Sequence, residues 1–313
     1  MTDLQEIIDD TVGRIRTTYI PHMQADLAKE EFNKLRRRGT TPTSALAVVV
    51  YGEAGVGKSA TALSWMREFP VKRGTPCDVR PVAYARLTGG RCTYRSVAME
   101  LLNAFEDPVP PPSRMNTREL INLVITRIRE QKTEFIFLDE CELLVSPENH
   151  RVNHETAQWI KSVLNDSPCP FGFLGTPPVL DVVSSTDSLE RRIDDKIEFS
   201  SYDWLKRDHR NEFRSVLATF DTLLAPLEPA GLAEMRMALN LHRATSGKIG
   251  YLPRLLGKAA ETALLDGART VQGNHLARAY DRSCHDAAAR ARNPFRTPDS
   301  GKLRGDTGMT TIN

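Results

Sequence analysis

Apolar residues recur at helical spacing over residues 3–38, and Pro21 interrupts the pattern, so two successive helices are expected. Residues 45–51 then form a continuous valine-rich run, which is typical of a strand buried on both faces of a parallel sheet. Strand and helix patterns alternate from there to residue 199, which predicts a doubly wound α/β fold. Further strands are expected at 82–87, 135–138 and 170–174, and helices at 58–69, 94–105, 116–131 and 154–165.

Beyond residue 199 only helical patterning remains, which predicts a smaller, all-helical domain. Its helices are expected at 211–224, 232–242, 252–266 and 274–290. The last residues are rich in glycine, proline and polar side chains, as in a flexible tail. The expected organisation is an N-terminal helical segment (1–40), an α/β domain (41–200), a helical lid domain (201–290) and a tail (291–313).

Composition narrows the function classes only slightly. A hydrophobic fraction of 40%, a charged fraction of 26% and a net charge of +2 are ordinary for a globular protein. They exclude a grossly basic nucleic-acid binder but not a local basic surface. The apolar runs are too short to span a bilayer and the N-terminus shows no export signal, so we expect a cytoplasmic protein. The five cysteines form no CxxC pair, which indicates neither a zinc site nor a disulfide framework.

One segment carries a specific chemical signature, because it matches G-x-x-x-x-G-K-[ST] between an expected strand and an expected helix. The glycines let the backbone wrap around phosphates with its N–H groups pointing inward. Lys58 is expected to reach the β- and γ-phosphates, and the Ser59 hydroxyl to bind Mg²⁺. The residues expected to bind nucleotide here are Gly52, Glu53, Ala54, Gly55, Val56, Gly57, Lys58, Ser59 and Ala60.

A second motif lies about eighty residues later, where the apolar run 135–138 ends in Asp139 and Glu140. Asp139 is expected to hold the magnesium shell beside the phosphate loop. Glu140 is expected to orient and deprotonate the attacking water. Together the two motifs predict hydrolysis of ATP or GTP, and the lack of a base-specifying GTPase signature favours ATP.

Three further side chains are candidates for the same reaction. Thr176 comes just after the expected strand 170–174. It either contacts the γ-phosphate or the water, or simply belongs to a strand-end turn. Arg191 and Arg192 are adjacent arginines with two possible roles. They are either solvated surface charges, or one of them reaches the nucleotide of a neighbouring subunit and stabilises charge on its γ-phosphate.

The order of these motifs resembles the AAA+ ATPases, and within them the TniB/TnsC transposition regulators and, more distantly, the target-selection ATPase of phage Mu. The resemblance covers roughly residues 14 to 285. It rests on residues 19–22 (Tyr-Ile-Pro-His), 137–140 (Phe-Leu-Asp-Glu), 173–176 (Phe-Leu-Gly-Thr) and the lid segment 246–256.

The resemblance implies a homo-oligomer, a ring or helical filament, that assembles with ATP on double-stranded DNA in the nucleoid. It implies that the assembly recruits a transposase, with a target-selection adaptor as a further partner, and that hydrolysis disassembles it. The nucleotide would lie between subunits, with Arg191 or Arg192 completing the neighbour's site. Tyr19, Ile20 and Leu252 would enclose the adenine, and Arg254 is the candidate for a lid arginine that contacts the γ-phosphate.

By the same resemblance, DNA would be bound through its backbone by two segments, one after the second strand and one before the Asp-Glu strand. Arginines, hydroxyl side chains and glycines suit phosphate contacts without base readout. The alternative is that these are solvated loops and helix caps. The candidate residues are Arg91, Thr93, Arg95, Arg114, Thr117 and Arg118.

Two other functions fit a nucleotide-binding chain of this kind. One is a replication-initiator or helicase-loader ATPase, a class that usually carries a winged-helix or zinc domain for which we expect no room after the lid. The other is a signalling switch or adaptor whose nucleotide gates protein contacts, and the basic loops weigh against it.

Overall fold

The computed structural model describes residues 2–39, 46–89, 92–106, 115–145, 154–283 and 292–296, which form two compact units. The α/β unit contains Tyr19–Asp203 and Lys248–Gly250. The helical unit contains the described residues of Met1–Thr18, Trp204–Gly247 and Tyr251–Asn313. Within the described part of the chain, no helix combines the length and apolar character needed to cross a membrane.

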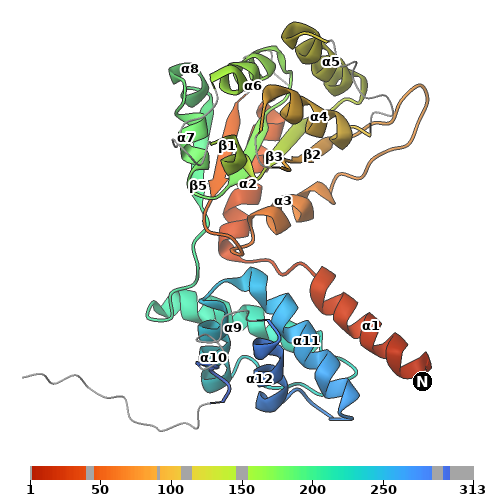
Figure 1. The fold of residues 1–313 in the computed structure, drawn as a ribbon, viewed down its shortest axis with the longest axis vertical. Helices are drawn as coiled ribbons and strands as arrows, with labels where there is room; N and C mark the ends of the chain where they lie inside the picture. Colours follow the sequence, from red (N-terminus) through yellow and green to blue (C-terminus); the bar gives the residue numbers. More distant parts are fainter. Residues whose placement is uncertain are drawn as a thin grey trace, which may run out of the picture. The chain divides into compact units, whose positions relative to one another are not determined.

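A five-stranded parallel sheet forms the centre of the α/β unit (Figure 1). The strand order is β2-β3-β4-β1-β5, so β4 lies between β1 and β3. Because all carboxyl ends of a parallel sheet meet at one edge, this order brings the residues that follow β1, β3 and β4 together. The strands are β1 (Ala47–Tyr51), β2 (Val82–Arg86), β3 (Phe135–Asp139), β4 (Phe171–Gly175) and β5 (Ile193–Glu198).

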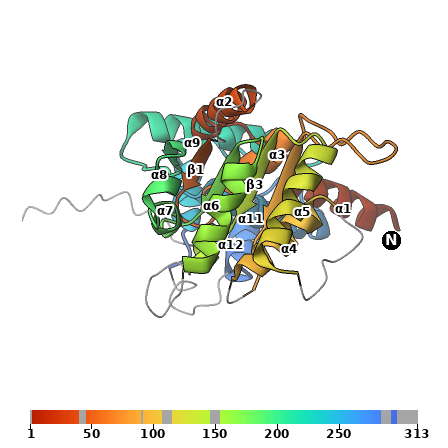
Figure 2. The same ribbon diagram turned by 90° about the horizontal axis from the view of Figure 1, so that it is seen from above.

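Alternate residues of the central strands enter two separate cores, one on each face of the sheet. Val48, Val50 and Phe137 pack with Phe32 and Trp65 of α2 (Met23–Arg38) and α3 (Lys58–Met66). Neighbouring strand residues face the opposite core, which is covered by α4 (Tyr94–Ala104), α5 (Thr117–Glu130) and α6 (His154–Asp166). Figure 2 shows the sheet between these two groups of helices. The expected doubly wound α/β fold is confirmed.

Strand β5 was not expected from the sequence, which reads Ile-Asp-Asp-Lys-Ile-Glu and has little apolar character. The reason is its position, because β5 is an edge strand that pairs only with β1 and leaves most of its side chains exposed. Charged residues on an edge strand oppose pairing with another chain. Lys34 ties the edge to α2, since its ammonium lies 2.9 Å from Glu31 and 3.0 Å from Asp194. Two short helices, α7 (Val179–Val183) and α8 (Asp187–Glu190), precede this strand.

Five α-helices of the described residues build the helical unit: α1 (Thr2–Thr17), α9 (Arg207–Thr222), α10 (Met235–Thr245), α11 (Leu252–Leu265) and α12 (Gly273–Asp281). The last four match the expected helices, although residues 284–290, expected at the end of the final helix, lie outside the described part.

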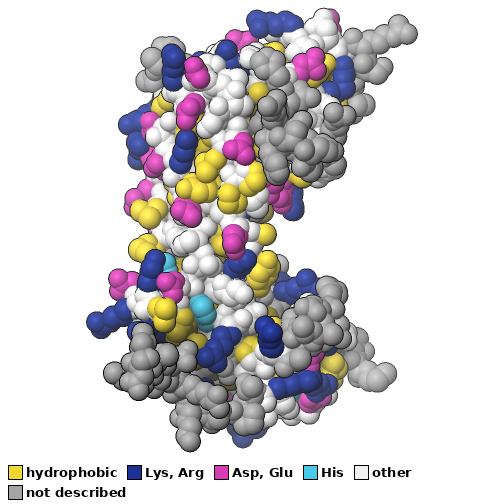
Figure 3. Space-filling model, turned by 60° about the vertical axis from the view of Figure 1, so that its left-hand side comes forward, with side chains coloured by type: hydrophobic (Ala, Val, Ile, Leu, Met, Phe, Trp, Pro, Cys, Tyr) yellow, Lys and Arg dark blue, Asp and Glu magenta, His cyan; other side chains and the backbone are white. Residues whose placement is uncertain are grey.

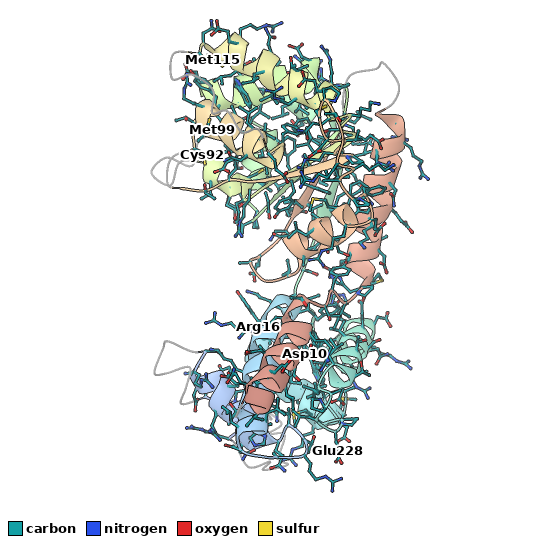
Figure 4. The ribbon with its side chains drawn as sticks, turned by 90° about the vertical axis from the view of Figure 1, so that its right-hand side faces the viewer. Asp10, Arg16, Cys92, Met99, Met115 and Glu228 are labelled. Atoms are coloured by element: carbon teal, nitrogen blue, oxygen red, sulfur yellow. The ribbon has the colours of Figure 1, made fainter. Side chains whose placement is uncertain are left out.

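Helix α1 corrects the expected grouping of residues 1–40 in one segment, because it packs along α11 while α2 packs on the sheet. Thr11 donates to the carbonyl of Ala225 at 3.2 Å, and Arg14 Nε donates to the carbonyl of Leu223 at 3.2 Å. The Arg16 side chain lies over Gly257, where an added Cβ would come within 3.4 Å of its Nε. These contacts attach α1 to the helical unit. Figure 4 labels Asp10 and Arg16 on this helix.

Because both faces of the sheet are packed, we expect the stability of the protein to be very sensitive to substitution of Gly172 in β4. A Cβ added there would lie 2.7 Å from Cδ1 of Phe137, a buried ring with little freedom to move. We expect Gly172→Ala to lower the free energy of unfolding by about 1–3 kcal/mol, measured by urea denaturation. Gly74→Ala is the matched control, because its nearest neighbour would be a carbonyl oxygen at an ordinary 3.5 Å. Equal stability of the two variants would contradict this description of the core.

Candidate active site

The loop between β1 and α3 is shaped by three glycines with positive φ angles: 150° at Gly52, 84° at Gly55 and 108° at Gly57. L-residues with a side chain rarely adopt these angles. Gly52 also has no room for a Cβ, which would lie 2.0 Å from the carbonyl oxygen of Phe199. Gly57 immediately precedes α3, so the helix begins at Lys58 with its free N–H groups beside the loop.

Lys58 is held inside this loop by the backbone. Its ammonium donates to the carbonyl of Gly52 at 2.7 Å and to that of Glu53 at 2.9 Å. Burial lowers the pKa of Lys58, and the nearby carboxylates of Glu142, Asp139 and Glu140 act in the opposite direction. The lysine is therefore a buried cation that faces three carboxylates.

Asp139 ends β3 and is almost completely buried, at 2% exposure. Its Oδ1 accepts the backbone N–H of Glu140 at 2.8 Å, and its Oδ2 accepts the hydroxyl of Tyr84. Burial and the negative charge of Asp139 raise the pKa of Tyr84, so its hydroxyl stays protonated and remains a donor. The Ser59 side chain acts on the same hydroxyl from the phosphate loop and lowers the pKa of Tyr84 to a smaller extent. Tyr84 thus connects the two motif residues that the sequence assigns to the metal.

Sequence analysis missed Tyr84, and the only available signal was one polar aromatic residue within the apolar strand β2. Arg86, at the end of the same strand, was missed as well. Its Nη2 lies 2.6 Å from Oε1 of Glu140. Glu140 itself has a left-handed backbone (φ 61°), which turns the chain sharply after β3 and exposes a third of its side chain. The expected general base is therefore held by an ion pair to the neighbouring strand.

Lys58, Asp139 and Glu140 line one cavity of ≈ 230 Å³ together with residues of the phosphate loop. Thr176 follows β4 directly and lies in the wall of the cavity. This agrees with its expected position between the two motifs, because β4 lies between β1 and β3. The segment Lys248–Gly250 lies against the phosphate loop: Gly250 donates its N–H to the carbonyl of Gly55 at 2.8 Å. Lys248 lies 2.6 Å from the carboxylate of Glu53. Of the residues expected to bind nucleotide or metal, the cavity wall contains Ala54, Gly55, Gly57, Lys58, Ser59, Ala60 and Asp139.

The residues expected around the adenine fall into both units. Tyr19 lies beside α3, with its hydroxyl 3.5 Å from Thr61 Oγ1 and its ring 4.9 Å from Lys29 Nζ. Ile20 is buried in the same unit. Leu252 and Arg254 lie on α11 of the helical unit, the first buried and the second exposed. Their roles stay predictions.

The two arginines after α8 differ in their surroundings. Arg191 ends the helix and is exposed, and its side chain makes no hydrogen bond or ion pair with any described residue. Arg192 is half-buried, and its carbonyl accepts the N–H of Ala47 at the start of β1. Arg191 is therefore the more accessible of the pair.

The two segments expected to contact DNA lie side by side, because Arg95 donates to the carbonyl of Met115. Figure 4 shows Cys92, Met99 and Met115 on the same side of the molecule. Thr93 caps α4 by accepting the N–H of Ser96. Thr117 is the first residue of α5, which Asn116 caps. Arg91 and Arg114 lie outside the described residues.

Charge in this region is mixed. Arg118, the remaining candidate, pairs with Asp166 at 3.3 Å although its side chain is 69% exposed. Figure 3 shows another side of the α/β unit, the one that carries α7, α8 and β5, and there too basic and acidic side chains are interspersed. A phosphate contact by Arg118 would have to replace this ion pair.

A magnesium–triphosphate group fits this cavity chemically. The glycine-shaped backbone and the start of α3 present N–H donors to phosphate, and Lys58 adds a positive charge. The Ser59 hydroxyl and the carboxylates of Asp139 and Glu140 are hard oxygen ligands of the kind that Mg²⁺ prefers.

A family model described as "Bacterial TniB protein" matches residues 14–201, more than half of the chain. The comparison with curated proteins gives no match. The fold is similar to that of the Aeropyrum pernix ORC2 protein in ADPNP–ADP complexes (TM-score 0.62, 13% identity, 87% of this chain and 71% of that one). It is also similar to Aeropyrum pernix ORC1 in complex with DNA (TM-score 0.60, 18% identity, 85% and 67%). A third similar structure is Drosophila ORC bound to DNA (TM-score 0.55, 14% identity, 91% and 67%). At these identities the likeness establishes an AAA+ type of fold.

The hydrogen bond from Tyr84 to Asp139 can be tested through stability. Tyr84→Phe leaves one oxygen of a buried carboxylate without its donor, so we expect a loss of about 1–3 kcal/mol in the free energy of unfolding. Urea denaturation measures it. Tyr94→Phe, whose hydroxyl bonds to no described residue, removes the same atom and is expected to change stability by less than about 0.5 kcal/mol. If both variants unfold alike, Tyr84 does not support Asp139.

Proposed function

Since the chain belongs to the TniB family of bacterial proteins, we propose that it is a magnesium-dependent ATPase that regulates DNA transposition. The observation that carries the proposal is one cavity lined by the phosphate loop, Lys58, Asp139 and Glu140. Nucleotide and DNA occur in the similar solved structures, and the proposal extends both ligands to this chain.

In this proposal each residue of the cavity has one task. The loop N–H groups and Lys58 bind the phosphates. Lys58 then donates to phosphate oxygens in place of the carbonyl oxygens of Gly52 and Glu53, which are acceptors as well. Ser59 and Asp139 hold Mg²⁺, which neutralises charge on the phosphates. Glu140 accepts a proton from the attacking water, and Thr176 contacts the γ-phosphate or that water. Arg86 competes with the water for Glu140, so it limits how often the base is available.

The site is completed in an oligomer, a ring or a helical filament. We assign to Arg191 the charge that stabilises the neighbour's γ-phosphate, because it is exposed and bound to no described side chain. Arg192 is the second choice, since its backbone is tied to β1. Tyr19, Ile20, Leu252 and Arg254 are assigned to the nucleotide on the strength of the family resemblance.

The oligomer binds the backbone of double-stranded DNA without sequence preference, within the nucleoid. The adjacency of the segments around Arg95 and Met115 supports a shared DNA-binding edge. Arg118 can reach a phosphate by leaving Asp166, because an exposed ion pair is worth only about 0–1 kcal/mol. The bound assembly recruits a transposase, together with a target-selection adaptor, and ATP hydrolysis dissolves it.

Two alternatives make different predictions. A replication-initiator or helicase-loader ATPase shares the fold of the ORC proteins, but its partner is the replication machinery rather than a transposase. A nucleotide-gated signalling adaptor does not need DNA at all. Assembly on duplex DNA of arbitrary sequence separates the proposal from the second of these.

We expect the purified protein to form rings or filaments on duplex DNA with a nonhydrolysable ATP analogue, as seen by electron microscopy. Lys58→Ala should abolish this assembly, because the phosphates lose their buried cation. Glu140→Gln should retain assembly with ATP and lower turnover by a factor of about 10²–10⁴. No assembly on DNA in the unaltered protein would remove the support for a transposition regulator.

A mixing experiment tests the assignment of Arg191. Arg191→Ala should bind ATP normally but hydrolyse it at least about a hundredfold more slowly. Mixed with Glu140→Gln, which supplies Arg191 but cannot hydrolyse, the variant should recover activity, because its intact sites then receive the neighbour's arginine. Arg192→Ala is the matched control. If mixing with Glu140→Gln restores the ATPase activity of Arg192→Ala but not that of Arg191→Ala, the role belongs to Arg192.

A further inference from the structure

Glu142 is a third carboxylate in the wall of the cavity, and the functions proposed above give it no task. It lies on the 3₁₀ helix η1 (Cys141–Leu144), which begins directly after Glu140. The sequence gives no reason to single it out, because acidic residues after a strand are common. Its surroundings in the fold are unusual for a surface glutamate.

The Oε2 atom of Glu142 is buried, and no hydrogen-bond partner for it is present among the described residues. A buried carboxylate oxygen without a donor is destabilising by about 1–3 kcal/mol or more. Native proteins keep such atoms at places where a ligand, an ion or an ordered water supplies the partner.

Space for this carboxylate is provided by Gly175 at the end of β4. A Cβ at Gly175 would lie 2.6 Å from Oε2 of Glu142, so no other residue fits without moving the carboxylate. Gly175 also accepts the N–H of Gly52 at 3.2 Å, which fixes this strand end against the phosphate loop. The position of Glu142 relative to the loop is therefore set by backbone contacts.

Glu142 also acts more strongly on Lys58 than the two motif carboxylates do. Of the three, it makes the largest contribution that raises the pKa of Lys58. Lys58 nevertheless donates to the carbonyls of Gly52 and Glu53 and forms no ion pair with Glu142 within 4.0 Å. The two charged side chains lie in the wall of the same cavity, where the phosphates are proposed to bind.

Asp139 differs from Glu142 in how its oxygens are used. One oxygen of Asp139 accepts the N–H of Glu140, and the other accepts the hydroxyl of Tyr84. Of these two carboxylates, it is Glu142 that has an oxygen without a hydrogen-bond partner among the described residues, and its side chain belongs to the cavity wall. Mg²⁺ keeps several waters when it binds with a nucleotide, and each of those waters needs an acceptor.

We propose that Glu142 is a positioning residue for the hydrated Mg²⁺ that accompanies the nucleotide, with its carboxylate accepting a hydrogen bond from a water of the ion's shell. This inference rests on the proposed function. The charge works in two directions, since it repels the phosphates and attracts the Mg²⁺ ion that accompanies them. Glu142 therefore makes nucleotide binding dependent on the metal.

The test is the affinity for ADP and for a nonhydrolysable ATP analogue, measured by calorimetry with Mg²⁺ and with EDTA. Glu142→Gln keeps the shape and removes the charge. It should bind metal-free nucleotide more tightly than the unaltered protein does, and the factor by which Mg²⁺ tightens binding should fall about tenfold. Glu142→Asp keeps the charge, so its metal-free binding should stay weak. Glu130→Gln, an exposed acid on α5, is the control and should change neither value.

A purely structural role would change both affinities of Glu142→Gln by the same factor and leave the effect of Mg²⁺ intact, which would overturn the inference. Gly175→Ala is the second variant, because its Cβ displaces the carboxylate without removing it. It should also reduce the metal effect, and an unchanged effect there counts against the inference. If the unaltered protein itself binds nucleotide equally well without Mg²⁺, the proposed function fails instead.

Discussion

The site depends on a close approach between backbone segments at the end of the sheet. Gly52 lies against the carbonyl of Phe199, where a Cβ would come within 2.0 Å, and its N–H reaches the carbonyl of Gly175 at 3.2 Å. Phe199 in turn donates its N–H to Tyr51 at 2.7 Å. The phosphate loop is thus anchored to strand ends on both sides of β1. Its geometry is fixed by the sheet rather than by its own flexible sequence, as a preorganised anion site requires.

Because the loop is fixed, the charged side chains around it have little freedom to change position. Lys58 is buried among backbone carbonyls, and three carboxylates face it from the turn after β3. Each carboxylate has a different environment: Asp139 is held by Tyr84, Glu140 is paired with Arg86, and Glu142 has an unpaired oxygen. Different hydrogen-bond partners give chemically identical groups different tasks. In the proposed function these three environments correspond to a metal ligand, a base and a positioning group.

The helical unit shows that neighbours in sequence need not be neighbours in structure. Residues 2–17 form a helix that packs along α11, more than two hundred residues away, while the next helix packs on the sheet. Conversely, Lys248–Gly250 belongs to the α/β unit although helices of the other unit flank it. The chain therefore crosses from one unit to the other on both sides of this segment.

The sequence by itself determined the fold class and most of the residues of the candidate site. The glycine-lysine-serine loop, the Asp139–Glu140 strand end and the alternation of buried strands with helices are local patterns, set by steric demands and side-chain period. It did not determine β5, whose polar residues form a strand only because β1 offers them a free edge. Nor did it show Tyr84, Arg86 or the unpaired oxygen of Glu142. Those roles arise from contacts between strands that are up to 55 residues apart, and such contacts exist only after the sheet has brought the strand ends together.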